Sequence, residues 1–225
     1  SLLTNKKWIL FGHGDWLGGT RVPNLIERGT YMPLTRTDLD MYQPDKVFLG
    51  HIHSKLDDPI FYPGSPCGID ITETGPRRFV VLDTEKDTVE NRIVDTDIIY
   101  QTCSFVILPV EDESEYIQNT ISREIDGWEN ECASTTKTVI RVQVKGYTRD
   151  KSKLNSLILQ AFNGYTFYKG EKPDLSEVST SLDINRMEIA RRVKEILDHL
   201  ELNKSQDEPE LNQVLIESLK LVFED

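Results

Sequence analysis

Val47-Phe48-Leu49-Gly50-His51-Ile52-His53 ends an apolar run of strand length with a glycine and two histidines one residue apart. Neutral imidazole is a favoured ligand for zinc, iron and similar divalent metals, and a glycine after a rigid strand permits the backbone to aim two rings. Upstream, residues 8–15 repeat the order of apolar strand, glycine and histidine, ending in Gly12-His13-Gly14-Asp15. We therefore expect three of the four histidines to lie just past strand ends.

An H-x-H pair alone is a weak indication of a metal site, because alternating residues of a strand face opposite sides. In that case one ring is packed and the other is solvated. His13 favours the metal site, since a third histidine in a like context 38 positions before His51 is what convergent strand ends in one sheet would provide. His13, His51 and His53 are therefore the candidate metal ligands.

The composition is that of a globular chain of 225 residues, long enough for one large domain or two ordinary ones. The net charge of -12 argues against a broadly basic nucleic-acid surface, although bound metal ions can supply positive charge in a phosphate site. No apolar stretch approaches the roughly 20 residues of a membrane span, and no charged segment with an apolar region behind it opens the printed sequence. We expect a cytoplasmic protein, or a nuclear one in a eukaryote, with no membrane partner.

The cysteines are three in number and far apart. Cys67, Cys103 and Cys132 form no C-x-x-C pair. This spacing predicts reduced, mostly buried thiols and no disulfide framework.

Residues 1–99 have the pattern of short strands separated by long loops. Apolar runs bounded by Gly, Pro and Asp predict strands at residues 8–11, 47–49, 60–62 and 79–82. A polar break after the last of these predicts a hairpin with residues 89–94. The connection 14–44 shows little periodicity, so it is either a functional loop or contains a missed element.

From residue 100 onward, the pattern changes to alternating strands and helices. Strands are predicted at residues 104–110 and 139–144, with a helix between them that is capped by Ser114 and runs through about Glu131. Ser152 is expected to start a second helix, followed by a strand near residues 165–168. Together these elements predict a small βαβαβ unit over residues 100–171.

Residues 172–225 begin as a polar connector and end in two amphipathic helices separated at residues 205–209. The first apolar stripe consists of Met187, Ala190, Val193, Leu197 and Leu200, and the second of Leu211, Val214, Leu215, Leu219 and Val222. Two interpretations remain open. The helices fold back onto the domain as an αα-hairpin, or their apolar face docks onto a partner.

Three motifs stand in order: Phe11-Gly12-His13-Gly14, Gly50-His51-Ile52-His53 and the turn Tyr62-Pro63-Gly64-Ser65-Pro66. This set resembles the calcineurin-like metallophosphoesterases. With the hairpin, the βαβαβ unit and the terminal helices, it is most similar to the SbcD-type nuclease subunit of the double-strand-break repair complex.

The resemblance implies an α/β (α+β) fold in three parts. Residues 1–99 would be the C-terminal part of a four-layer metallophosphoesterase β-sandwich. Residues 100–171 would be a capping domain that shapes the DNA path, and residues 172–225 a linker with a two-helix segment that docks on an ATPase.

The resemblance also implies roles for the histidines. His13 matches the lone-histidine motif and His51 the first histidine of G-H-x-H, and both bind the second of two metals in the family. His53 matches the histidine that binds the first metal. The two divalent metals, commonly manganese in this branch, clamp a phosphodiester and activate a bridging water or hydroxide. The implied partners are DNA, an SbcC-type coiled-coil ATPase at residues 172–225 and a second copy of the complete protein.

The sequence departs from the family pattern in the early motifs. D-x-H, G-D and G-N-H, which supply the other metal ligands, the bridging aspartate and a catalytic histidine, are not present in order, and Gly14-Asp15 adjoins the lone histidine instead. We therefore expect a longer phosphoesterase whose catalytic residues lie upstream of Ser1. By itself, this chain is expected to have little or no nuclease activity.

Several other polar residues have an ordinary interpretation beside a functional one. Cys67 follows the Ser65-Pro66 turn and is expected to be a packed or idle thiol. Asp15 either orients His13 as a hydrogen-bond acceptor or is a solvated loop residue. His199 lies among acidic neighbours on a helix and has no expected catalytic role.

The leading hypothesis is part of a metal-dependent DNA exonuclease and endonuclease that acts with an SMC-like ATPase in break repair. A phosphoesterase acting on nucleotides or phosphoproteins would share G-H-x-H, and a non-catalytic adaptor could bridge DNA and an ATPase. The extra unit and the terminal helices favour the nuclease, because small-substrate enzymes need neither. Arg77 and Arg78 are candidates for contact with a phosphate backbone, but adjacent residues entering a strand point opposite ways, so one is expected to be merely exposed.

Overall fold

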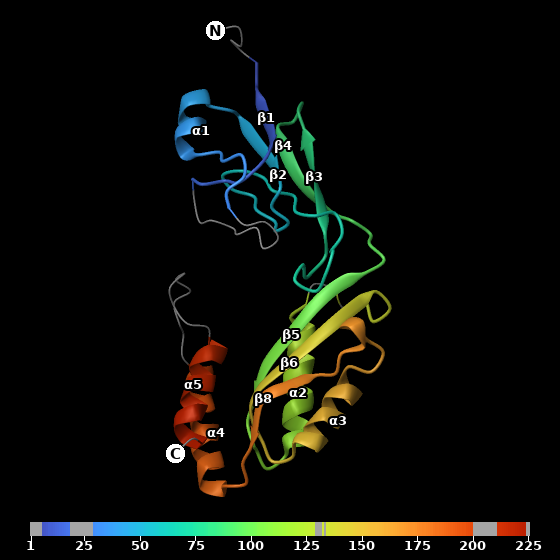
Figure 1. Ribbon diagram of the computed structural model, residues 1–225, viewed down its shortest axis with the longest axis vertical. Coiled ribbons are helices and arrows are strands. Elements are labelled where there is room, and N and C mark those ends of the chain that lie inside the picture. Colours follow the sequence, from blue (N-terminus) through green and yellow to red (C-terminus); the bar gives the residue numbers. More distant parts are fainter. Residues whose placement is uncertain (1–5, 19–28, 129–131, 133, 200–210, 224–225) are drawn as a thin grey trace. The chain divides into compact units, whose positions relative to one another are not determined.

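The computed structural model describes residues 6–18, 29–128, 132, 134–199 and 211–223, and its fold is of the mixed α/β class (Figure 1). The chain divides into two compact units, Ser1–Ile99 and Tyr100–Asp225, which are described separately. Among the described helices, none combines the length and the apolar character that crossing a membrane requires.

The first unit is organised around two parallel strands. β1 (Ile9–His13) pairs with β2 (Lys46–Gly50) in a register that sets His13 opposite Gly50. The apolar residues of β2 are buried and contribute to a core that consists of Trp16, Val47, Leu49, Ile52, Ile60 and Tyr62. Because the strands are parallel, their carboxyl ends meet at one edge of the sheet.

The connection between these strands contains an element that the sequence pattern did not reveal. α1 (Arg36–Tyr42) begins at a capping box in which Thr35 and Asp38 exchange side-chain and backbone hydrogen bonds. It has only seven residues and no fully buried side chain, so it carries little apolar periodicity. The strand predicted at residues 60–62 is only a pair of isolated bridges, in which Phe61 pairs with Phe48 and Tyr62 with Leu56.

The predicted hairpin is confirmed. β3 (Arg78–Asp83) pairs in antiparallel register with β4 (Thr88–Ile93). In the turn, the Asp83 carboxylate accepts hydrogen bonds from the backbone N–H groups of Glu85 and Lys86. This local side-chain bonding is the usual reason for aspartate at a turn.

The second unit contains a four-stranded sheet with β6 (Thr138–Thr148) at its centre. β5 (Ile99–Ile107) lies on one side of β6, and the short β7 (Thr166–Phe167) and β8 (Asp174–Thr180) pair with it in parallel on the other side. The strand predicted near residues 165–168 is therefore only two residues long and leads into a 3-10 turn, η2 (Tyr168–Gly170).

β8 corrects the interpretation of residues 172–181 as a polar connector. Its sequence is mostly polar because among the described strands only β6 pairs with it and only its Leu175 and Val178 pack into the core. A strand at a sheet edge with one packed face lacks the apolar run from which strands are predicted.

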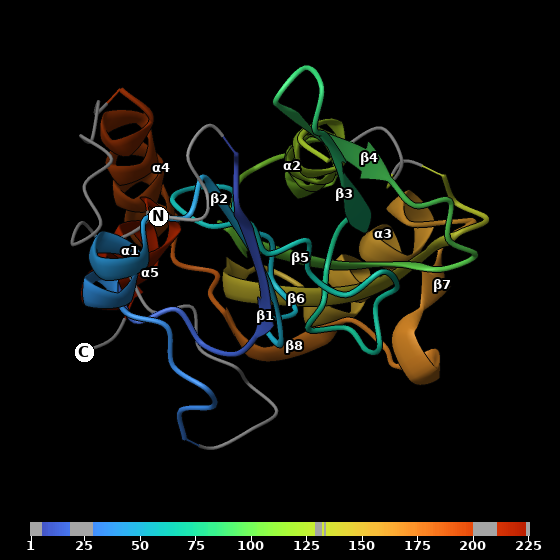
Figure 2. The ribbon, with the colours of Figure 1, turned by 90° about the horizontal axis from the view of Figure 1, so that it is seen from above.

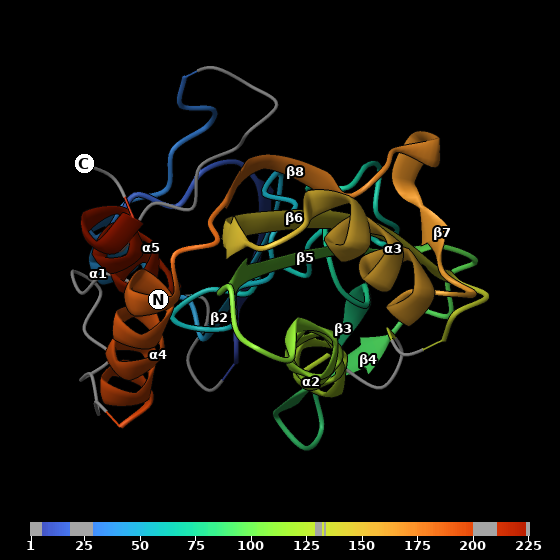
Figure 3. The same cartoon turned by 90° about the horizontal axis from the view of Figure 1, so that it is seen from below.

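Two helices cover one face of this sheet and lie side by side (Figure 3). α2 (Glu113–Asp126) is capped by Asp112 and α3 (Lys151–Ala161) by Asp150, so each starts one residue before the serine expected to cap it. α2 ends at its C-cap Gly127 and not near Glu131, a residue outside the described ranges. The core on this face includes Phe105 and Ile107 of the alternating strand β5.

The C-terminal helices cover part of the other face. α4 (Ile184–Asp198) and α5 (Leu211–Phe223) run beside each other (Figures 1 and 2). Their residues Ala190, Val193, Leu197, Leu215, Leu219 and Val222 pack with Val106, Leu108 and Tyr147 of the sheet layer. The predicted stripes thus fold back onto the unit. Leu200 and the separator 205–209 lie outside the described residues.

A pair of leucines on α5 tests this packing. Leu219 is fully buried and Leu221 is 87% exposed. We expect Leu219→Ala to lower the free energy of unfolding by about 2–5 kcal/mol because it leaves a cavity, and Leu221→Ala to change it by less than about 0.5 kcal/mol. Urea denaturation followed by far-UV circular dichroism measures both, and equal effects would contradict the described packing of α5.

Candidate functional site

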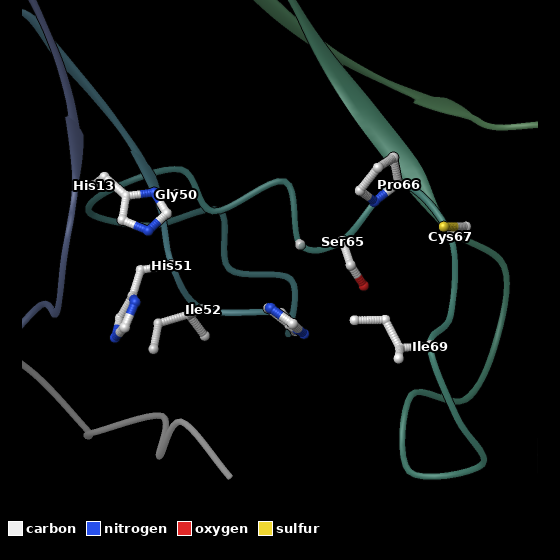
Figure 4. A pocket seen from close by; sticks show the side chains of 10 residues that line it. His13, Gly50, His51, Ile52, Ser65, Pro66, Cys67 and Ile69 are labelled. Atoms are coloured by element: carbon white, nitrogen blue, oxygen red, sulfur yellow. The ribbon is translucent and has the colours of Figure 1, made fainter. Parts of the chain in front are cut away.

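The three predicted metal-ligand histidines line one pocket at the carboxyl edge of the β1–β2 sheet. The pocket has a volume of about 570 Å³. Its lining comprises His13, Gly50, His51, Ile52, His53, Gly64, Ser65, Pro66, Cys67 and Ile69. Figure 4 shows His13 and His51 on one side and the turn residues Ser65, Pro66 and Cys67 on the other. The G-H-x-H segment and the Y-P-G-S-P turn therefore face the same space.

His13 and His51 lie next to each other. Their ring centroids are 5.3 Å apart, with the ring planes at 69°. The closeness depends on Gly50, since a Cβ at this position would lie 2.7 Å from His13 Nδ1. His51 itself has a φ of 90°, a strained conformation that non-glycine residues adopt mainly where surrounding contacts enforce it, often at functional sites.

Tyr31 and Asp15 form a second layer behind this pair. The Tyr31 ring stacks on His51 at 5.1 Å and meets His13 edge-on at 6.0 Å. The Asp15 carboxylate accepts a hydrogen bond from the Tyr31 N–H at 2.7 Å and lies 3.9 Å from His51 Nε2. Asp15 is only 3% exposed, so it is not a solvated loop residue. The histidine that its carboxylate faces is His51, not the predicted His13.

His53 is held differently, because its Nδ1 lies 2.6 Å from Glu73 Oε1. The second carboxylate oxygen of Glu73 accepts a hydrogen bond from the Ser65 hydroxyl at 2.5 Å. Sequence reasoning missed Glu73 and Tyr31, since neither belongs to a motif. Ser65 could have been identified from the sequence, because it belongs to the Y-P-G-S-P turn.

The two arginines do not behave as predicted. Both are buried, at 4% exposed for Arg77 and 9% for Arg78, so neither is the merely exposed residue expected from alternation. Arg77 Nη2 donates to the His53 carbonyl at 2.6 Å. Arg78 makes a two-pronged ion pair with Asp57 at 2.7 and 2.8 Å, which lowers the pKa of Asp57. Their guanidinium groups bind protein acceptors.

The three cysteines are free, but their environments differ. Cys103 and Cys132 are buried as expected, and burial raises the pKa of Cys103 well above its usual range. Cys67 is exposed and lines the pocket, so it is not a packed thiol. His199 is the C-cap of α4, in the second unit.

In the part of the chain that the structure describes, the candidate ligands do not all come together around one point. Among those residues, no group of three or more His, Cys, Asp or Glu side chains is arranged to hold a metal ion. The site brings His13 and His51 together and places His53 on the same pocket, with its Nδ1 engaged by Glu73.

Gly50→Ala tests the dependence of His13 on this glycine. We expect the new Cβ to push the His13 ring aside and to destabilise the first unit by about 1–3 kcal/mol, as overpacking does. The side-chain NMR resonances of His13 should move, while those of His199 stay in place. Gly127→Ala is the control, because its Cβ would meet no atom closer than 3.4 Å. Unmoved His13 resonances in Gly50→Ala would contradict the described contact.

We also compared the chain with known proteins. No family model matches it, and no curated protein matches it.

Proposed function

We propose that the first unit is part of a divalent-metal phosphoesterase site. The observation that carries the proposal is the meeting of His13 and His51, 5.3 Å apart, at the carboxyl ends of two parallel strands. His53 lines the same pocket. Open sheets with parallel strands bind their ligands at this edge, where loops can supply chemical groups.

The donor set fits a divalent metal. Imidazole nitrogens suit zinc, iron and related ions, and a carboxylate on the other ring nitrogen of a ligand histidine is the common second layer of such sites. The pair of His53 and Glu73 has that form. His13, His51 and His53 would hold two divalent metals, manganese by the resemblance, together with ligands from the motifs that this sequence lacks. When bound, the metals would supply Lewis acidity and a polarised water.

Within this class, we propose DNA as the substrate and phosphodiester hydrolysis as the reaction. The second unit supports DNA over a nucleotide or phosphoprotein, because its sheet and the four α-helices described for it form a compact unit that a small substrate would not require. The net charge of -12 is compatible with such a substrate only if metal ions or a partner supply positive charge at the phosphate.

For the partner, we propose an SbcC-type coiled-coil ATPase that docks on α4. Ile189 and Ile196 are seven residues apart, or about two helical turns, and are 51% and 63% exposed. They lie beside the stripe that packs inward, so the helix pair can rest on its own sheet and still present apolar side chains to a partner. A second copy of the complete protein remains a further proposed partner.

Manganese binding tests the site directly. We expect the 225-residue chain to bind Mn²⁺, and His51→Ala or His13→Ala to weaken binding at least about tenfold, since loss of a second-layer partner alone costs about 10–100-fold. Electron paramagnetic resonance of free Mn²⁺ measures the affinity. His199→Ala, in the second unit, is the control and should bind like the wild type. Equal affinity in all four proteins would refute the proposed metal site.

The nuclease proposal has its own test. In a Mn²⁺-dependent assay on linear DNA, we expect this chain alone to cleave little or none, because the D-x-H, G-D and G-N-H motifs are not present in order in its sequence. Cleavage should appear when a polypeptide with D-x-H, G-D and G-N-H motifs is joined ahead of residue 1. If this chain cleaves DNA strongly and still does so after His51→Ala and His53→Ala, these histidines are not the metal ligands of the nuclease site.

A further inference from the structure

The turn Tyr62-Pro63-Gly64-Ser65-Pro66 connects the two halves of the pocket. The buried Tyr62 hydroxyl donates to the Gly14 carbonyl at 2.6 Å, which ties the turn to the residue after His13. Gly64 has a φ of +83°, and a Cβ there would lie 2.7 Å from the His53 carbonyl oxygen. Glycine is therefore required for the turn to approach His53 this closely.

Glu73 is the acceptor on which this turn and His53 converge. One oxygen, Oε1, faces His53 Nδ1 at 2.6 Å. The other, Oε2, receives the Ser65 hydroxyl at 2.5 Å and the Ile69 N–H at 3.3 Å. The Glu73 side chain is only 10% exposed, so few water molecules can replace these donors.

Arg77 fixes the donors in place. Its Nη2 donates to the Ser65 hydroxyl at 2.5 Å and to the His53 carbonyl, and its Nε donates to the Ser65 carbonyl at 2.9 Å. The Ser65 hydroxyl thus accepts one hydrogen bond from Arg77 and donates its own proton to Glu73. Arg77 Nη2 also lies 3.8 Å from Glu73 Oε2, where its charge favours the ionised carboxylate.

The donors around Glu73 decide the direction of the bond to His53. Glu73 Oε2 accepts hydrogen bonds from both the Ser65 hydroxyl and the Ile69 N–H, an arrangement that suits a carboxylate without a proton. An ionised carboxylate only accepts hydrogen bonds. His53 Nδ1 must therefore carry the proton, which leaves Nε2 without one in the neutral ring.

We infer that Glu73 is a positioning residue that holds neutral His53 with its proton on Nδ1, so that Nε2 is available to a divalent cation. The inference rests on the proposed function for the cation and on the described hydrogen bonds for the proton. Ser65 and Arg77 act through Glu73 and keep its two oxygens assigned to different donors.

Glu73→Gln gives a directional test. Oε2 meets two donors, so the amide oxygen of glutamine should take that place and the amide NH₂ should face His53 Nδ1. An NH₂ group donates, so the proton of His53 should move to Nε2, the position that a cation needs. Long-range ¹H–¹⁵N NMR about two pH units above the ordinary histidine pKa of about 6.5 reports which nitrogen carries the proton. Glu90→Gln, an exposed carboxylate on β4, is the matched control.

The metal readout uses the same variants. We expect Glu73→Gln to weaken Mn²⁺ binding by about 10–100-fold and Glu90→Gln to leave it unchanged. In a His53→Ala background, Glu73→Gln should have no further effect, because a residue that acts through His53 loses its influence when the ring is gone. A general loss of structure would instead weaken binding in both backgrounds.

The outcomes separate this inference from the proposed function. If the wild type binds Mn²⁺ and Glu73→Gln changes neither its affinity nor the proton position, the role of Glu73 is refuted while the metal site stands. If the wild type binds no Mn²⁺ but the proton moves as described, the metal site is refuted while Glu73 still positions the ring. Movement of the proton together with the His53-dependent loss of affinity supports both.

Discussion

The parallel pairing of β1 with β2 is the constraint on which the first unit depends. Its register sets His13 opposite Gly50, so the two strands end together and the histidines of both motifs emerge at one edge. A slip of one residue would turn His13 to the other face and separate it from His51. Parallel strands cannot be joined by a tight turn, and here the connection runs through α1 and returns at Lys46. The buried hydrogen bond from the Tyr62 hydroxyl to the Gly14 carbonyl also ties the end of β1 to the turn at residues 62–66.

The carboxyl edge of the β1–β2 sheet could be predicted from the sequence, because the motifs that mark it are formed by neighbouring residues. An apolar run followed by glycine and histidine appears twice, and period and turn residues also identify the β3–β4 hairpin. The hydrogen-bond network around His53 could not be predicted from the sequence, because its residues are far apart along the chain. Glu73 is 20 residues from His53 and Tyr31 is 20 residues before His51, and no periodicity relates such positions. Buried carboxylates in loops look like solvated ones until the chain is folded, as Asp15 illustrates.

In the second unit, β8 was missed because the two faces of the sheet are covered to different extents. Phe105 and Ile107 of β5 face α2 and α3, while Val106 and Leu108 meet α4 and α5. On β6, by contrast, Arg141 and Lys145 alternate with buried valines and pair with Glu171 and Glu177 at the surface. β8 extends this half-covered region and so has few apolar residues. A polar stretch in the sequence therefore concealed a strand, whereas the amphipathic helices, whose own period is long, were recognised.

The pocket raises the question of where positive charge for a phosphate would come from. Of the described residues, those that line it include no lysine or arginine. The guanidinium of Arg77 donates to the carbonyls of His53 and Ser65 and to the Ser65 hydroxyl. Arg77 itself is buried, at 4% exposed, and does not line the pocket. Under the proposed function, phosphate binding would therefore depend on bound metal ions for positive charge, because the Arg77 guanidinium is used in the hydrogen bonds that position His53.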